Sequence, residues 1–255
     1  MLPTGSLIQP VTTLGGKPVE AVSTTTVDGV NVCGWLIRNS NQRVVIVFAG
    51  YGGNRSTNLG LAEFYLSRGW SVLLPDLRAT GESGGDQVGF GYLERRDVRA
   101  WVEFAKNSGL TEIGLHGQSL GAAAIVYSLA ESPCDFSFIV LDSCYDDLRN
   151  ALYHRLSWLP VPSLTLKPVE WFGSAALGTP IDRLRPLDTI KFVSCPVLFV
   201  AGDQDSRVLP SETLLLFAAC PEARKKLCWM PGGRHENLWI RFSDEYASAI
   251  DAILK

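Results

Sequence analysis

Short runs of apolar residues alternate along the chain with longer segments in which apolar residues recur every three or four positions. The runs have the length of strands, and the periodic segments have the length of helices. The predicted strands lie at residues 44–48, 70–75, 113–116, 138–141, 196–201 and 226–230, and the predicted helices at 58–68, 94–107, 120–130, 211–219 and 236–254. This alternation predicts an α/β fold with a mostly parallel, doubly wound sheet and helices on both of its faces.

Two parts of the chain interrupt the alternation. An Asp28-Gly29 turn between residues 24–27 and 30–37 predicts an antiparallel hairpin near the N-terminus. The segment from Cys144 to Cys195 is too long for a plain crossover, so we name it the insert (residues 144–195). We expect a single domain over residues 1–255, in which the insert forms a lid or a pocket wall, or else only covers the sheet.

Composition and charge narrow the function classes. A formal net charge of −3 gives no basic surface for nucleic acid, and no apolar run approaches the length of a membrane span. The N-terminal residues lack the basic and apolar regions of a signal peptide, which predicts a cytoplasmic protein. Six dispersed cysteines without metal-ligand spacing predict free thiols and no metal site. They are Cys33, Cys134, Cys144, Cys195, Cys220 and Cys228.

The segment Gly117-Gln118-Ser119-Leu120-Gly121 joins a predicted strand directly to a predicted helix. A Gly-x-Ser-x-Gly in that context is typical of a nucleophile elbow, a sharp turn that exposes the serine hydroxyl at the edge of the sheet. Residues 81–85 match the same Gly-x-Ser-x-Gly pattern, but Ser83 neither follows a strand directly nor begins a helix. Ser119 is therefore the predicted nucleophile, and Ser83 is expected to be a loop serine.

A serine nucleophile needs a base, usually histidine, and a carboxylate that orients the base. His235 lies in the loop at residues 231–236, between the last strand and the last helix, where the order serine, acid, histidine places the base. His116 is expected to be a hydrogen-bonded core residue. His154 lies in the insert, where it would be solvated or would touch the substrate.

Three aspartates compete for the role of the acid. Asp205 lies just past the carboxyl end of a buried strand and is the favoured candidate. Asp203 is nearer the strand end, where it would cap the turn, and Asp142 ends the preceding strand. The predicted oxyanion hole consists of the backbone N–H groups of Leu120, which follows the nucleophile, and Tyr51, in the glycine-rich loop after residues 44–48.

These motifs resemble those of the α/β-hydrolase superfamily, and within it the small serine-hydrolase or dienelactone-hydrolase-like branch. The resemblance runs from about Val27 to the C-terminus and rests on residues 117–121, 202–208 and 232–235, with a further similar loop at 75–83. The chain differs from the common pattern at Ala49 and Ala79.

Together these features predict a cofactor-free serine hydrolase that cleaves carboxylic esters of short-to-medium acyl chain through an acyl-enzyme. A thioesterase, acyltransferase or peptidase would use the same triad, and a non-catalytic hydrolase-fold protein that binds a ligand or partner is the rival from another class. Apolar side chains of the insert are expected to line the pocket for a small-molecule acyl substrate, namely Trp158, Trp171 and Phe172. The sequence indicates no oligomeric state.

Overall fold

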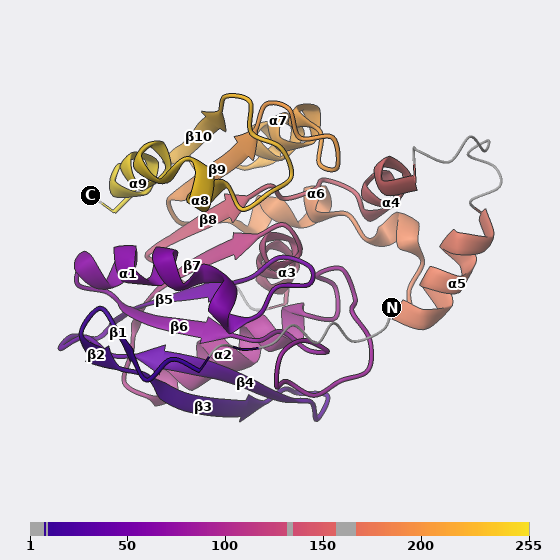
Figure 1. Cartoon of the computed structure of the whole chain (residues 1–255). Coiled ribbons are helices and arrows are strands. Elements are labelled where there is room, and N and C mark those ends of the chain that lie inside the picture. Colours follow the sequence, from indigo (N-terminus) through magenta and orange to yellow (C-terminus); the bar gives the residue numbers. More distant parts are fainter. Residues whose placement is uncertain (1–7, 9, 132–134, 157–166, 255) are drawn as a thin grey trace.

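A twisted eight-stranded sheet is the centre of the computed structural model, which describes residues 8, 10–131, 135–156 and 167–254 (Figure 1). The strand order is β10-β9-β8-β7-β5-β6-β4-β3. The strands are β3 Glu20–Thr25, β4 Asn31–Ile37, β5 Arg43–Phe48, β6 Ser71–Pro75, β7 Glu112–Gln118, β8 Phe138–Asp142, β9 Val197–Gly202 and β10 Lys225–Met230. The strands from β10 to β6 in this order are parallel, and β4 and β3 add an antiparallel hairpin at one edge.

Helices cover both faces of the sheet. They are α1 Leu59–Ser67, α2 Arg95–Asn107, α3 Leu120–Leu129, α4 Leu148–Leu156, α5 Lys167–Leu177, α6 Pro186–Thr189, α7 Pro210–Ala219, α8 Leu238–Arg241 and α9 Ser243–Asp251. Short 3-10 turns are η1 Arg55–Asn58, η3 Ile181–Arg183 and η4 Ile190–Phe192, and a small separate ribbon pairs β1 Thr13–Leu14 with β2 Lys17–Pro18.

The apolar runs form strands because both faces of the sheet are buried. Successive residues of a strand point to opposite faces, so Val44, Ile46 and Phe48 of β5 pack in the core beneath α2 and α3. Val45 and Val47 pack in the second core, beneath α1, α8 and α9. The predicted α/β-hydrolase fold, with a mostly parallel sheet and helices on both faces, is confirmed.

Two elements differ from the prediction. The segment 236–254 forms two helices rather than one, because the backbone of Phe242 leaves the helical region (φ −127°, ψ 42°) between α8 and α9. Leu238 of α8 and Tyr246 of α9 are both buried in the same core, so their apolar spacing gives no sign of the break. The insert, which the sequence pattern left without elements, contains α4, α5 and α6.

The described cysteines are all free thiols, and Cys134 lies outside the described residues. Burial raises the pKa of Cys195 to about 12 and raises that of Cys144 further, whereas Cys33 is half-buried. We therefore expect all six cysteines to be alkylated in denaturant without reductant. In the native protein Cys33 should react before Cys144, because the thiolate is the reactive form. Mass spectrometry checks both statements, and a pair that resists alkylation in denaturant would reveal a disulfide.

No helix in the described part of the chain combines the length and the apolar character needed to cross a membrane.

Candidate active site

Ser119 occupies the turn between β7 and α3, in a backbone conformation that residues other than glycine rarely adopt (φ 50°, ψ −107°). Two glycines make the turn possible. A Cβ on Gly117 would lie 2.5 Å from the backbone nitrogen of Ala122, and a Cβ on Gly121 would lie 2.6 Å from the carbonyl oxygen of Phe48. The strained serine and its two glycines are the local geometry of a nucleophile elbow.

Ser119, His235 and Asp205 form a continuous hydrogen-bonded chain. The Ser119 Oγ lies 3.0 Å from the Nε2 of His235, and the Nδ1 of His235 lies 2.8 Å from the Oδ2 of Asp205. The Oδ1 of Asp205 accepts hydrogen bonds from the backbone N–H groups of Arg207 and Val208, at 2.8 and 2.9 Å. These bonds fix the carboxylate, so its second oxygen can orient the imidazole.

The sheet explains why residues so distant in sequence meet. Ser119 follows β7, Asp205 follows β9 and His235 follows β10, and these strands run parallel. The carboxyl ends of parallel strands share one edge of the sheet, where ligands of open α/β sheets bind. The three side chains therefore converge at that edge.

The other two aspartates have different partners. The Oδ1 of Asp203 accepts a hydrogen bond from the backbone N–H of Gly232 at 2.6 Å and so ties two loops together. Asp142 is buried and accepts hydrogen bonds from the hydroxyl groups of Ser143 and Tyr246. Burial raises the pKa of Asp142 to about 7. The structure thus brings Asp205 to the imidazole, as the sequence favoured.

The remaining histidines lie apart from this chain of contacts. His116 is buried between the hydroxyl groups of Tyr65 and Tyr246, at 2.9 and 3.0 Å, and burial lowers its pKa to about 3. It is a hydrogen-bonded core residue, as expected. The Nδ1 of His154 on α4 lies 3.1 Å from the Oε1 of Glu212, whose pKa burial raises to about 8.

The loop after β5 packs directly against the nucleophile. A Cβ on Gly50 would lie 3.5 Å from the Cβ of Ser119, and Gly52 has a positive φ of 79°. Within the described residues, the backbone N–H groups of Tyr51 and Leu120 donate no hydrogen bond to another part of the chain. Both are therefore available as donors beside Ser119, although their role as an oxyanion hole stays a prediction.

A cavity of about 230 Å³ opens above Ser119 and His235. The sequence reasoning missed several polar residues that line it, including Gln118, Ser143 and Arg207. The Gln118 Nε2 donates a hydrogen bond to the carbonyl oxygen of Glu236 at 3.0 Å and so connects the elbow to the histidine loop. Its place directly before Ser119 was the available signal.

The three aromatic residues predicted to bind substrate do not line this cavity where the structure describes them. Trp171 and Phe172 lie on α5, at the periphery of the molecule, and are 67% and 65% exposed (Figure 1). Their rings contact each other edge to face, with centroids 4.9 Å apart. Trp158 lies outside the described residues, so the contribution of all three to substrate binding stays a prediction.

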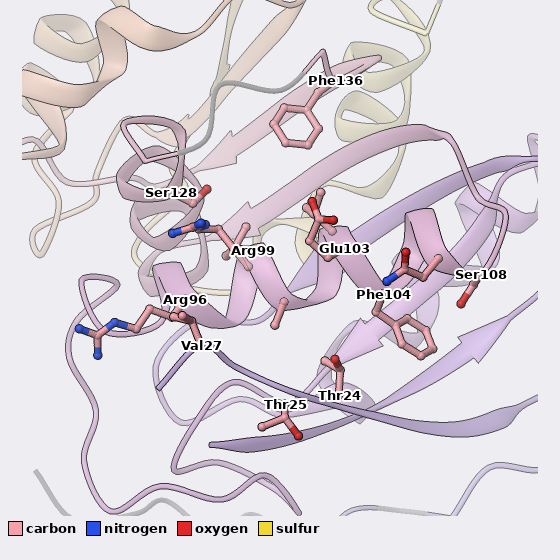
Figure 2. A pocket seen from close by; sticks show the side chains of 14 residues that line it. Thr24, Thr25, Val27, Arg96, Arg99, Glu103, Phe104, Ser108, Ser128 and Phe136 are labelled. Atoms are coloured by element: carbon pink, nitrogen blue, oxygen red, sulfur yellow. The ribbon is translucent and has the colours of Figure 1, made fainter. Parts of the chain in front are cut away.

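A larger cavity, of about 520 Å³, lies between β3 and α2 (Figure 2). Its lining includes Thr24 and Thr25 of the edge strand, Arg99 and Glu103 of α2, and Phe136. None of the described residues that line it belongs to the chain of contacts around Ser119, and no histidine is among them. Of these two cavities, the smaller one is therefore the candidate active site, because Ser119 and His235 line it.

The sheet topology and the elbow geometry define an α/β hydrolase. The sequence model of the prolyl oligopeptidase family matches residues 59–252, and the chain belongs to that family. YqkD of Bacillus subtilis (strain 168) is 27% identical over 236 residues, which cover 89% of this chain and 76% of YqkD. Protein bem46 of Schizosaccharomyces pombe is 24% identical over 227 residues, which cover 86% of this chain and 71% of bem46.

Solved structures have the same fold. The esterase Pf2001 of Pyrococcus furiosus superimposes with a TM-score of 0.82 at 23% identity, covering 100% of this chain and 97% of the esterase. The α/β hydrolase GrgF of Penicillium sp. sh18 has a TM-score of 0.72 at 19% identity and covers 93% and 98% of the two chains. The predicted membership of the α/β-hydrolase superfamily is confirmed.

Proposed function

We propose that the protein is a cofactor-free serine hydrolase that cleaves carboxylic esters of short-to-medium acyl chain through an acyl-enzyme. One observation carries the proposal, the unbroken chain of contacts from the Ser119 Oγ through both nitrogens of His235 to the Oδ2 of Asp205. A nucleophile hydrogen-bonded to a base, which is itself oriented by a third group, is the arrangement that activates a serine.

The proposed reaction has two steps. The Ser119 Oγ attacks the acyl carbon while the His235 Nε2 takes the hydroxyl proton, and His235 then passes that proton to the departing alkoxide. Water then attacks the acyl-enzyme and gives a proton to His235, which returns it to the Ser119 Oγ as the bond between that oxygen and the acyl carbon breaks and the acid is released. Asp205 holds the imidazole in the tautomer that carries its proton on Nδ1, and the N–H groups of Tyr51 and Leu120 stabilise the oxyanion.

The size of the cavity supports the substrate class. A space of about 230 Å³ suits a small acyl group better than a long lipid chain. Pf2001, which shares the fold, is described as an esterase. The dispersed free thiols suit a reducing compartment, so a cytoplasmic location belongs to the proposal. We further propose that the insert contributes a pocket wall within a single domain.

Peptide hydrolysis is the second candidate, because the family to which the chain belongs takes its name from an oligopeptidase. The same three residues would act, with His235 protonating an amine instead of an alkoxide. Thioester hydrolysis and acyl transfer would use these residues too. Parallel assays with an ester and the matching anilide separate esterase from peptidase, since a peptidase would turn over both.

Covalent labelling tests the proposed nucleophile. A fluorophosphonate probe should modify the purified protein at Ser119 alone, because only an activated serine attacks the phosphorus atom of the probe and displaces fluoride. Peptide mapping locates the adduct. A labelled serine other than Ser119 would reject the proposed site, and an unlabelled, folded protein would favour a non-catalytic ligand-binding role.

We expect kcat/KM for p-nitrophenyl esters to rise with acyl length only over short and medium chains and to fall for palmitate. Each methylene group that the pocket buries contributes about 0.8 kcal/mol of favourable binding free energy, and this gain stops where the cavity ends. Steady-state kinetics over the ester series check this. A continuous rise out to palmitate would contradict it. An unchanged preference in Trp158→Ala and Trp171→Ala would exclude these side chains from the pocket.

A further inference from the structure

Glu94 is a fully buried carboxylate that the proposed chemistry does not use. It is the N-cap residue of α2, yet its side chain makes no capping hydrogen bond to that helix. Its two oxygens instead accept hydrogen bonds from the backbone N–H groups of Gly89 and Gly91, each at 2.7 Å. Burying a carboxylate is costly in free energy. The two short hydrogen bonds therefore indicate that Glu94 has a specific structural role in the loop before α2.

That loop holds Phe90 in a strained conformation. Phe90 lies between the two amides that Glu94 binds and has a φ of 53°, a region that side chains larger than glycine rarely occupy. The hydroxyl of Tyr145 donates a hydrogen bond to the carbonyl oxygen of Phe90. Without support such a residue would relax, so the bonds that Glu94 accepts from the two flanking amides and the bond that Tyr145 donates keep Phe90 in place.

Phe90 connects the loop to the oxyanion donors. Its ring lies nearly parallel to that of Tyr51, with an interplanar angle of 10° and centroids 6.4 Å apart. Glu94, Tyr51 and Leu120 also line one small cavity of about 10 Å³ behind the elbow. On the other side, a Cβ on Gly91 would lie only 2.8 Å from the Cβ of Ala123 in α3, so the loop is wedged against the nucleophile helix.

We propose that Glu94 is a positioning residue for the oxyanion hole: its carboxylate fixes Phe90, and Phe90 holds Tyr51 where its N–H can meet the oxyanion. The inference rests on the proposed function of Ser119. Glu94 does not line the cavity above Ser119, so its effect on the reaction is indirect. Loss of this support affects the transition state more than the ground state, because the oxyanion forms only as the acyl carbon is attacked.

The surroundings of Glu94 give the inference a pH signature. Burial, with a contribution from Asp97 on α2, raises the pKa of Glu94 to about 7. Arg78, which follows β6 and lines the same small cavity, is paired with Asp97 at 2.7 Å and with Asp28 at 2.8 Å. Tyr51 of the loop after β5 and Leu120 of α3 line this cavity as well. Protonation of Glu94 as the pH falls through 7 removes acceptor capacity, and the loop loosens.

The test is Glu94→Gln, with Glu103→Gln, an exposed glutamate on the same helix, as the matched control. A glutamine amide can accept from one of the two N–H groups but opposes the other. We expect kcat to fall on the order of tenfold, a fraction of what complete loss of an oxyanion donor costs, with KM nearly unchanged. The acid limb of log kcat near pH 7 should also become less steep, because the glutamine that replaces Glu94 has no carboxylate to protonate.

A second variant keeps the test decisive if Glu94→Gln fails to fold. Phe90→Gly suits a positive φ and leaves Glu94 in place, but it removes the ring that faces Tyr51. It should lower kcat by a similar factor. Unchanged kcat in Phe90→Gly, or an unchanged acid limb in a folded Glu94→Gln, would overturn the role of Glu94.

Hydrogen exchange separates this inference from the proposed function. Amide exchange in the peptide that contains Tyr51 should become faster in Glu94→Gln and stay at the wild-type rate in Glu103→Gln, whether or not the protein hydrolyses esters. Wild-type protein without labelling or turnover, but with this exchange response, would reject the proposed function alone. Normal turnover with no exchange response would reject the positioning role alone.

Discussion

Replacing Ser119 with alanine is expected to lower kcat by about 10⁶-fold, and replacing His235 with alanine should cost about as much, because triad residues act as a unit. Alanine removes only the hydroxyl, and the elbow itself depends on the two glycines beside Ser119 rather than on the serine side chain. The fold should therefore survive. Burst-phase and steady-state kinetics with an activated ester, together with circular dichroism of each variant, check both statements.

Ser83→Ala is the matched control, since Ser83 lies in the second Gly-x-Ser-x-Gly of the chain. Its Oγ donates a hydrogen bond to the carbonyl oxygen of Asp76 and accepts one from the N–H of Cys33, both at 2.8 Å. The substitution should cost about 1–3 kcal/mol of stability through the loss of these two partly buried hydrogen bonds and leave kcat near the wild-type value. Activity that disappears in Ser83→Ala and persists in Ser119→Ala would refute the assignment of the nucleophile.

The strands could be predicted because the sheet is buried on both faces. Every residue of β6, β8 and β9 is buried, so each strand reads as an apolar run, with polar residues only at the start of β6 (Ser71) and the end of β8 (Asp142). The strand order and the side chains that meet across the sheet depend on contacts between distant residues. A pattern of apolar positions does not contain that information.

The insert shows what the pattern of apolar positions does not determine. None of the described side chains of α5 is buried, so the apolar residues of this helix do not mark a face that packs on the core. Trp171 and Phe172 are large and apolar, and from the sequence alone they suggested a pocket wall. Their exposure on α5 shows that hydrophobic character does not by itself determine the direction in which a side chain points.

In the candidate site, too, some residues could be predicted from the sequence and others could not. Ser119 and His235 could be chosen from the sequence because one follows a strand and begins a helix, and the chain has only three histidines. The sequence marked Gln118 only by its place directly before Ser119, and it did not mark Glu94 at all. Gln118 contacts the carbonyl oxygen of Glu236, and the role that we propose for Glu94 rests on the ring contact between Phe90 and Tyr51. Such contacts exist only in the folded chain.

Asp205→Asn is expected to lower kcat by about 10⁴-fold, the loss seen for the same change in another triad enzyme. The asparagine NH₂ would face the Nδ1 of His235 and favour the tautomer with its proton on Nε2, which then points at Ser119 and cannot accept the hydroxyl proton. The backbone bonds from Arg207 and Val208 remain possible, so the loop should keep its shape. Steady-state kinetics at neutral pH measure the effect.

Asp203→Asn and Asp142→Asn provide the comparison, and both should retain kcat within about an order of magnitude of wild type. Asp142 also has a stability signature. Because its folded pKa is raised from 3.8 to about 7, the native state binds its proton more tightly than the unfolded chain does. Its contribution to stability is therefore lost as the pH rises from 3.8 through 7, and Asp142→Asn should lessen that loss. Wild-type kinetics in Asp205→Asn, combined with a large loss of kcat in Asp142→Asn, would show that Asp142 and not Asp205 is the acid of the triad.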